Sequence, residues 1–234
     1  EIGVEYFVYS SVSSCIDGIK YSKIEKEIDK IYSILKYNPD KVKPLLWIVP
    51  EYFKQGFDLD KFGELPYCGF KIHPRAHNWD LTDTKTIDIC DRIFSFSEKQ
   101  KVPILLHTGE DEIDRASKFQ TYFEKYGNAT IVLAHGRPFE DTLLILERYP
   151  NVYVDTAFMP EETVNKIINK GFIGRIIFGT DFPITNYYNN KFHQNLSLKE
   201  SYQKDLNSIY TLGKEYREII IGNTMKIYKF FPLN

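Results

Sequence analysis

The sequence lacks the features that mark several classes of protein. Its 234 residues contain no apolar run near the roughly 18 to 20 residues that a membrane span requires. The three cysteines form neither a C-x-x-C pair nor a disulfide-dense pattern. Neither sign of charge dominates, because 30 Lys and Arg residues face 32 Asp and Glu residues, for a net charge of −2. We therefore expect a cytoplasmic protein with a small-molecule substrate, and no binding to nucleic acid or membranes.

Glycine-rich phosphate loops are also missing. No G-x-G-x-x-G or G-x-x-x-x-G-K-S/T follows a strand-like segment, which argues against an open nucleotide-binding sheet. Instead, seven short apolar runs alternate with stretches of helical periodicity, the pattern of parallel strands joined by helices. The predicted strands are Tyr6–Val12, Val42–Val49, Gly69–His73, Val102–His107, Thr130–His135, Val152–Thr156 and Arg175–Gly179.

This repeat predicts a TIM-type (β/α)8 barrel that occupies residues 1–234 as a single domain. The strand ends recur about every 28 residues, close to the roughly 30 residues of one βαβ unit. The strand count is one short of eight, and the chain opens within a few residues of its first predicted strand. We therefore expect the first strand of the barrel to be missing from this chain, which leaves the domain incomplete at its N-terminus.

Polar residues stand at the C-terminal ends of the predicted strands, where barrels of this type carry their active sites. Among them, His107, His135 and Asp181 supply two imidazoles and a carboxylate, a set that suits Zn²⁺ or a similar divalent ion. Such an ion lowers the pKa of a bound water to about 7, which makes hydroxide available at neutral pH. The sequence therefore predicts one metal site at the mouth of the barrel.

Six segments carry a resemblance to a known family. In chain order they are Gly69–Pro74, Pro103–Gly109, Leu133–Gly136, Asn151–Asp155, Ile177–Pro183 and Gly222–Thr224. Their order and spacing resemble the amidohydrolase superfamily, specifically the amidohydrolase 2 branch, which contains enzymes of the aminocarboxymuconate-semialdehyde decarboxylase type. The resemblance implies that His107 and Asp181 bind the metal and that Asp181 handles the proton of the attacking water. It also implies that His135 is a second-metal ligand or a catalytic base.

The resemblance does not decide which residues bind the substrate. Lys71 is either a carboxylated lysine that bridges two metals or an ordinary lysine that meets a substrate carboxylate or Asp155, and we favour the second interpretation. His73, Arg137 and Asp155 are the other predicted substrate-binding residues. Members of the family carry His-x-His at the end of their first strand, and this sequence contains no such motif. The missing motif and the missing strand point to the same place, so the metal site of this chain would be incomplete or empty.

Three functions remain open from the sequence. The first is a metal-dependent hydrolase, with zinc as the expected ion, that uses a metal-activated water on a C–N or C–O bond of a small carboxylated or cyclic substrate. The second is a non-oxidative decarboxylase of the same fold. The third is a catalytically inactive barrel that serves as a binding or scaffold protein. Aromatic residues on the predicted helix faces are compatible with a homodimer.

Overall fold

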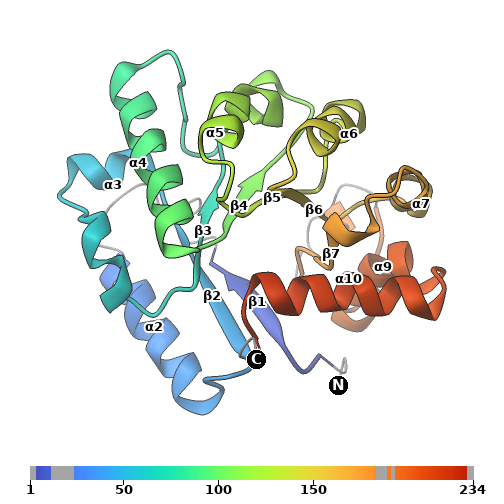
Figure 1. The fold of residues 1–234 in the computed structure, drawn as a ribbon. Helices are drawn as coiled ribbons and strands as arrows, with labels where there is room; N and C mark the ends of the chain where they lie inside the picture. Colours follow the sequence, from blue (N-terminus) through green and yellow to red (C-terminus); the bar gives the residue numbers. More distant parts are fainter. Residues whose placement is uncertain (1–3, 12–23, 183–188, 191–192, 231–234) are drawn as a thin grey trace.

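The computed structural model describes residues 4–11, 24–182, 189–190 and 193–230. In this part of the chain, seven parallel strands form one sheet whose spatial order is their order in the sequence (Figure 1). Each strand lies within the run predicted for it. The strands are β1 (Phe7–Ser10), β2 (Val42–Trp47), β3 (Gly69–Ile72), β4 (Ile104–His107), β5 (Ile131–Ala134), β6 (Val152–Asp155) and β7 (Ile176–Ile177).

Helices alternate with the strands and surround the sheet (Figure 1). They are α2 (Ile24–Tyr37), α3 (Pro50–Lys54), α4 (Thr84–Gln100), α5 (Gln120–Lys125), α6 (Phe139–Arg148), α7 (Glu161–Asn169), α9 (Leu198–Tyr210) and α10 (Lys214–Ile227), with 3-10 segments η2 (Leu59–Glu64), η3 (Glu112–Asp114), η4 (Ala116–Phe119) and η5 (Ile173–Arg175). Local chemistry sets their ends: the Asp83 carboxylate accepts the N–H of Thr86 at 3.1 Å at the start of α4. Within the described residues, no helix combines the length and the apolar character that crossing a bilayer requires.

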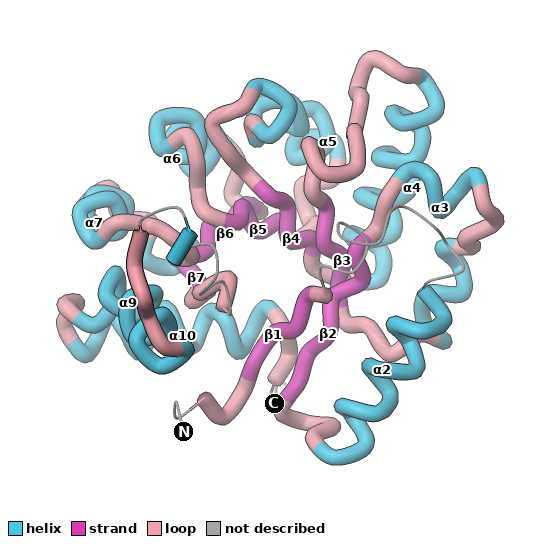
Figure 2. Tube along the Cα trace, turned by 180° about the vertical axis from the view of Figure 1, so that it is seen from behind, coloured by secondary structure: helices cyan, strands magenta, loops and turns pink. Residues whose placement is uncertain are grey.

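The sheet is curled and therefore has an outer face and an inner face (Figure 2). Each face buries its own set of side chains. The outer face packs against the helices in a large core that includes Ile104 and Leu106 of β4. Leu105, between them, joins a smaller cluster on the inner face. That cluster is built on Leu45, Val132, Ile177, Tyr228 and Phe230. Because side chains alternate along a strand, this division determines which strand-end residues face the interior of the curl.

The curl does not close within the described residues. β1 and β7 are the two edges of the sheet, and no ladder joins them in this part of the chain. α10 packs against β7 and η5 at one of these edges (Figure 1). The architecture is that of a TIM-type barrel that lacks one strand.

Candidate active site

The C-terminal ends of the strands bring polar side chains to the inner face of the curl. Because the strands are parallel, these ends lie at one mouth. The alternation that places Leu105 inside also turns His107, two residues later, to the inside. Lys71 of β3 and Asp155 of β6 face the same way, since their strand neighbours belong to the outer core. Three residues of the predicted site therefore share one orientation for a simple geometric reason.

Three histidine rings lie in contact at this mouth. His73, just after β3, stacks on His107 with ring centroids 3.7 Å apart and an angle of 15° between the rings. His107 also meets His135, at the end of β5, with centroids 4.8 Å apart and an angle of 74°. The indole of Trp47, at the end of β2, lies 5.9 Å from the ring of His73. Residues far apart in the sequence thus form one aromatic cluster.

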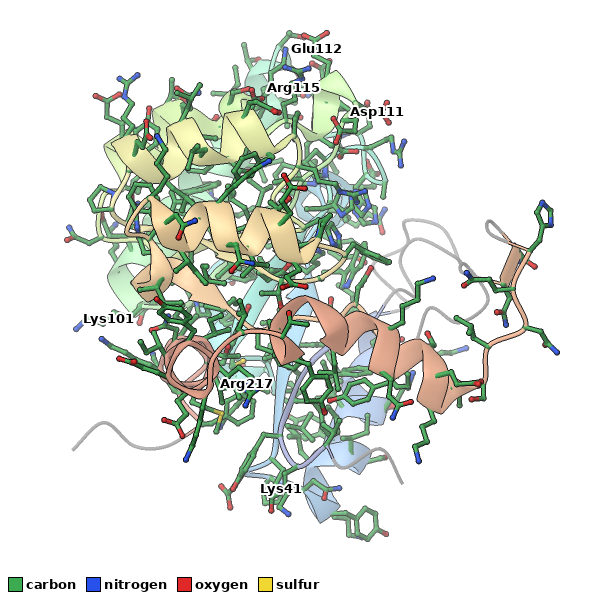
Figure 3. The ribbon with its side chains drawn as sticks, turned by 90° about the vertical axis from the view of Figure 1, so that its right-hand side faces the viewer. Lys41, Lys101, Asp111, Glu112, Arg115 and Arg217 are labelled. Carbon is green, nitrogen blue, oxygen red and sulfur yellow. The ribbon has the colours of Figure 1, made fainter. Side chains whose placement is uncertain are left out.

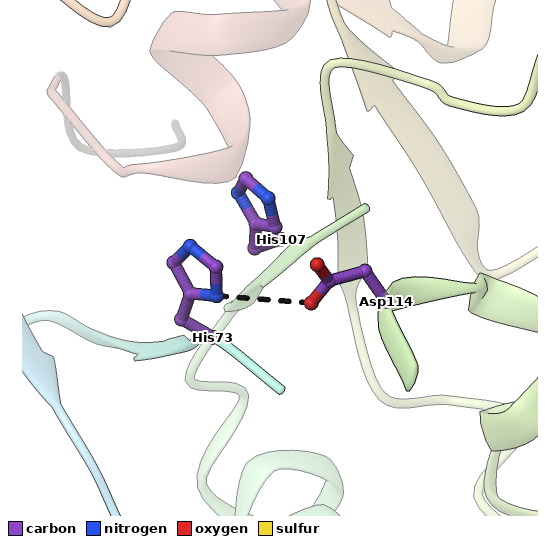
Figure 4. A group of neighbouring side chains, drawn as sticks. All are labelled: His73, His107 and Asp114. Atoms are coloured by element: carbon purple, nitrogen blue, oxygen red, sulfur yellow. Dashed lines mark ion pairs between the residues drawn. The ribbon is translucent and has the colours of Figure 1, made fainter. Parts of the chain in front are cut away.

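Asp114 lies close to two of these histidines, His73 and His107 (Figure 4). The ligand atoms of His73, His107 and Asp114 all lie within 4.8 Å of one another, which makes the group a candidate metal site. Asp114 belongs to η3 and is only 2% exposed. Its Oδ1 accepts the backbone N–H of Arg75 at 2.9 Å and lies 3.8 Å from Nδ1 of His73. Neither a strand end nor a periodic pattern marks Asp114 in the sequence, so sequence reasoning misses it.

The loop that carries Asp114 has a rim of charged side chains. Figure 3 shows Asp111, Glu112 and Arg115 together at the edge of the molecule. Glu112 accepts the ammonium of Lys118 at 2.6 Å, and Arg115 pairs with Asp141 at 3.6 Å. Exposed pairs of this kind contribute about 0 to 1 kcal/mol each, so they hold the loop weakly.

Burial keeps the histidines of the site neutral. It lowers the pKa of His73 and of His135 to about 3, and the positive charge of Lys71 is the next cause in both. The pKa of His107 is lowered by the same two causes. Neutral imidazole is the form that binds a metal ion or accepts a proton. All three rings are therefore in the required form at neutral pH.

Two cations and two carboxylates complete the mouth. Lys71 is 7% exposed, and the Nε atom of Arg137 is buried without a hydrogen-bond partner among the described residues. Burial raises the pKa of Asp155 to about 6, against the backbone N–H of His135 and the charge of Lys71, which lower it. Asp181 follows β7, and the residue as a whole is solvent-exposed. Its carboxyl group is nevertheless desolvated by the surrounding protein, which raises the pKa of that group, while the charges of Lys71 and Arg137 lower it. Lys71 thus acts electrostatically on both carboxylates and on all three histidines.

The predicted metal ligands only partly coincide with the close group. His107 belongs to that group and contacts His135, whereas the ligand atoms of His135 and Asp181 are not part of it. His73 is in the group, although the sequence assigns it to substrate binding. In the structure, His107 is therefore grouped with His73 and Asp114 and also contacts His135.

The donors at this mouth fit a divalent metal ion. Neutral imidazoles and carboxylates are ligands that zinc takes in proteins. The rings of His107 and His135 are in contact, with an angle of 74° between them, and the rings of His73 and His107 are stacked and nearly parallel. The ligand atoms of His73, His107 and Asp114 lie close together, and His135 is a further imidazole next to His107.

The chain is similar to known proteins in sequence family and in fold. Residues 29–210 match the family model described as Amidohydrolase. No curated protein sequence matches the chain closely enough to count as a relative. Among solved structures, 2-pyrone-4,6-dicarboxylic acid hydrolases are similar in fold. A putative one from Pseudomonas putida is 15% identical with a TM-score of 0.67, covering 98% of this chain and 84% of that one. A probable one from Acinetobacter baumannii, with citric acid bound, is 12% identical with a TM-score of 0.65, covering 96% and 84%.

A third structure of similar fold belongs to an enzyme of another reaction class. It is a 2,6-dihydroxybenzoate decarboxylase in complex with 2,6-dihydroxybenzoate, 12% identical with a TM-score of 0.59. The alignment covers 96% of this chain and 98% of that one. At such low identities, these likenesses establish the fold alone.

Proposed function

This chain belongs to the amidohydrolase family and is an enzyme of that type, and from this premise we propose that it is a zinc-dependent hydrolase of small carboxylated or cyclic substrates. The bond attacked is a C–N or C–O bond. Amidohydrolases are generally metal-dependent, and the neutral imidazoles at the mouth support a metal centre here. Among the described residues, Cys68 and Cys90 are free thiols, which supports a reducing compartment, and we propose the cytoplasm.

We assign the metal to His107, His135 and Asp181. The contact between the rings of His107 and His135 supports this choice. The carboxylate of Asp114 already has other partners: it accepts a hydrogen bond from the backbone N–H of Arg75 and lies 3.5 Å from the Arg75 guanidinium. When bound, a zinc ion would supply a water with a pKa near 7.

The residues of the chain then have separate tasks in hydrolysis. Asp181 accepts the proton of the attacking water, and His107 and His135 hold the ion that would polarise the substrate group under attack. The Nε of Arg137, which is buried without a hydrogen-bond partner among the described residues, binds a substrate carboxylate, and the positive charge of Lys71 at the same mouth adds to the attraction. His73 lies beside His107 at the same mouth. In this proposal Lys71 is an ordinary charged lysine.

The single observation that carries the proposal is the contact of neutral His107 and His135 rings beside two cations at the mouth. A zinc titration followed by calorimetry tests it. We expect one site per chain, with an affinity that falls at least about 10-fold in His135→Ala and in Asp181→Asn. The matched variants His73→Ala and Asp114→Asn should keep the affinity. The reverse pattern would move the ion to the group of His73, His107 and Asp114 and refute our assignment.

Decarboxylation is the second candidate function, because a decarboxylase shares the fold. Incubation with 2-pyrone-4,6-dicarboxylate and, separately, with 2,6-dihydroxybenzoate distinguishes the two reactions. Hydrolysis in H₂¹⁸O places the label in the ring-opened product of the pyrone. Release of CO₂ from the benzoate without label uptake would support the decarboxylase instead.

A further inference from the structure

The position of His135 breaks the alternation of its strand. Ile131 and Leu133 of β5 belong to the outer core, and Val132 belongs to the inner cluster. A regular strand would therefore turn His135, which follows Ala134, outward to the helices. Its ring nevertheless contacts His107, which faces inward. The backbone must therefore depart from regular strand geometry at His135, so that its side chain points inward.

This departure from strand geometry is a left-handed turn at His135 and Gly136. His135 has φ of 74° and Gly136 has φ of 55°. For a residue with a side chain, this conformation costs roughly 1 to 2 kcal/mol and persists only where the surroundings hold it. The contacts of the His135 backbone should therefore reveal what keeps the ring in place.

One carboxylate oxygen holds this backbone. Oδ1 of Asp155 accepts the N–H of His135 at 2.9 Å and the N–H of Ala157 at 3.1 Å. The carbonyl of Ala157 in turn lies 3.3 Å from Nδ1 of His135. A carbonyl can only accept, so Nδ1 carries the proton and Nε2 keeps its lone pair. Asp155 thus fixes the backbone directly and the tautomer through one intermediate residue.

Thr108 holds the other side of the same turn. Its hydroxyl donates to the carbonyl of Ala134 at 2.6 Å and accepts the N–H of Arg137 at 3.0 Å. Thr108 touches neither Ala157 nor the ring of His135 through these bonds. It therefore provides a matched control that loosens the turn without changing the contact at Nδ1.

We propose that Asp155 is the positioning residue of His135: it holds the left-handed backbone that turns the imidazole into the mouth and, through Ala157, presents Nε2 unprotonated. The sequence assigns Asp155 to substrate binding, whereas here its Oδ1 is committed to two backbone donors. The role of Asp155 rests on the function proposed for His135. The hydrogen bonds that define the role do not depend on that function.

The test is the tautomer of His135, read from ¹⁵N chemical shifts of metal-free protein at neutral pH. We expect Nδ1–H in the wild type. Asp155→Ala removes both bonds and should populate Nε2–H, whereas Asp155→Asn retains an acceptor oxygen and should preserve Nδ1–H. Thr108→Val should preserve it as well. A wild-type tautomer retained in Asp155→Ala, or lost equally in Thr108→Val, would overturn the proposal.

Zinc affinity provides the second readout and keeps the proposal testable if Asp155→Ala does not fold. Removal of a partner that orients a ligating histidine typically weakens metal binding by about 10- to 100-fold. We expect that loss in Asp155→Leu, which fills the site but cannot accept, and near wild-type affinity in Asp155→Asn. Equal affinities in the two variants would contradict the role. If the wild type binds no zinc, the proposed function fails, and the tautomer measurement still decides the role of Asp155.

Discussion

Replacement of Gly136 by alanine probes the turn that presents His135. The glycine has φ of 55°, so alanine would pay roughly 1 to 2 kcal/mol for the left-handed backbone. Its Cβ would also lie 2.7 Å from Cγ2 of Val154 and 2.8 Å from Cε of Met159. The methionine tip can shift, but Val154 is fully buried on β6 and its branched side chain is stiff. Overpacking of this kind costs about 1 to 3 kcal/mol, which brings the expected loss to about 2 to 5 kcal/mol.

Gly171→Ala is the matched control for this variant. Gly171 has φ of 86°, and nothing lies within 4 Å of a Cβ added there. Its replacement should therefore cost the backbone term alone, about 1 to 2 kcal/mol. Urea denaturation measures both losses, and an unchanged slope would show that the unfolded states are comparable. If Gly136→Ala lost no more stability than Gly171→Ala, the close packing of β5 against β6 at this turn would be wrong.

Two further predictions concern charge. Burial lowers the pKa of His77 to about 4, so between pH 6.5 and 4 the unfolded chain binds more protons and stability falls as the pH falls. Between pH 7 and pH 5, the wild type should lose about 2 kcal/mol more than His77→Gln in urea melts; equal losses would contradict the burial of a neutral ring. Lys71→Met and Arg137→Met should each raise KM for a dicarboxylate substrate by about 10- to 100-fold with a smaller change in kcat, since a charged hydrogen bond contributes about 1.5 to 3 kcal/mol. An unchanged KM in both variants would remove the proposed carboxylate site.

The strands could be predicted closely because each is a short apolar run bounded by polar or turn residues. All of the observed strands except β4 end earlier at the mouth than predicted, and beyond β7 side chains replace the backbone ladder. At the end of β7, the N–H of Phe178 goes to the hydroxyl of Thr224 at 2.7 Å, and the N–H of Gly179 goes to Thr156 at 3.2 Å. Such long-range partners leave no local signal in the sequence.

The inward direction of His107 and Lys71 could be predicted from alternation alone. His135 could not, because its direction depends on a positive φ that a carboxylate on the next strand holds. Asp114 escaped prediction for a related reason: it reaches the site from a 3-10 segment that folds back, with its carbonyl accepting the N–H of Gly109 at 3.3 Å. Sequence patterns thus predict the strands that carry the site better than the loops that fold back onto it.

The most direct test of the metal assignment is anomalous scattering at the zinc edge from crystals of this protein soaked in zinc. Our account predicts one strong peak within bonding distance, about 2.0 to 2.2 Å, of His107, His135 and Asp181. A peak bound by His73 and Asp114 instead would contradict it, as would a mouth without zinc at saturating concentration.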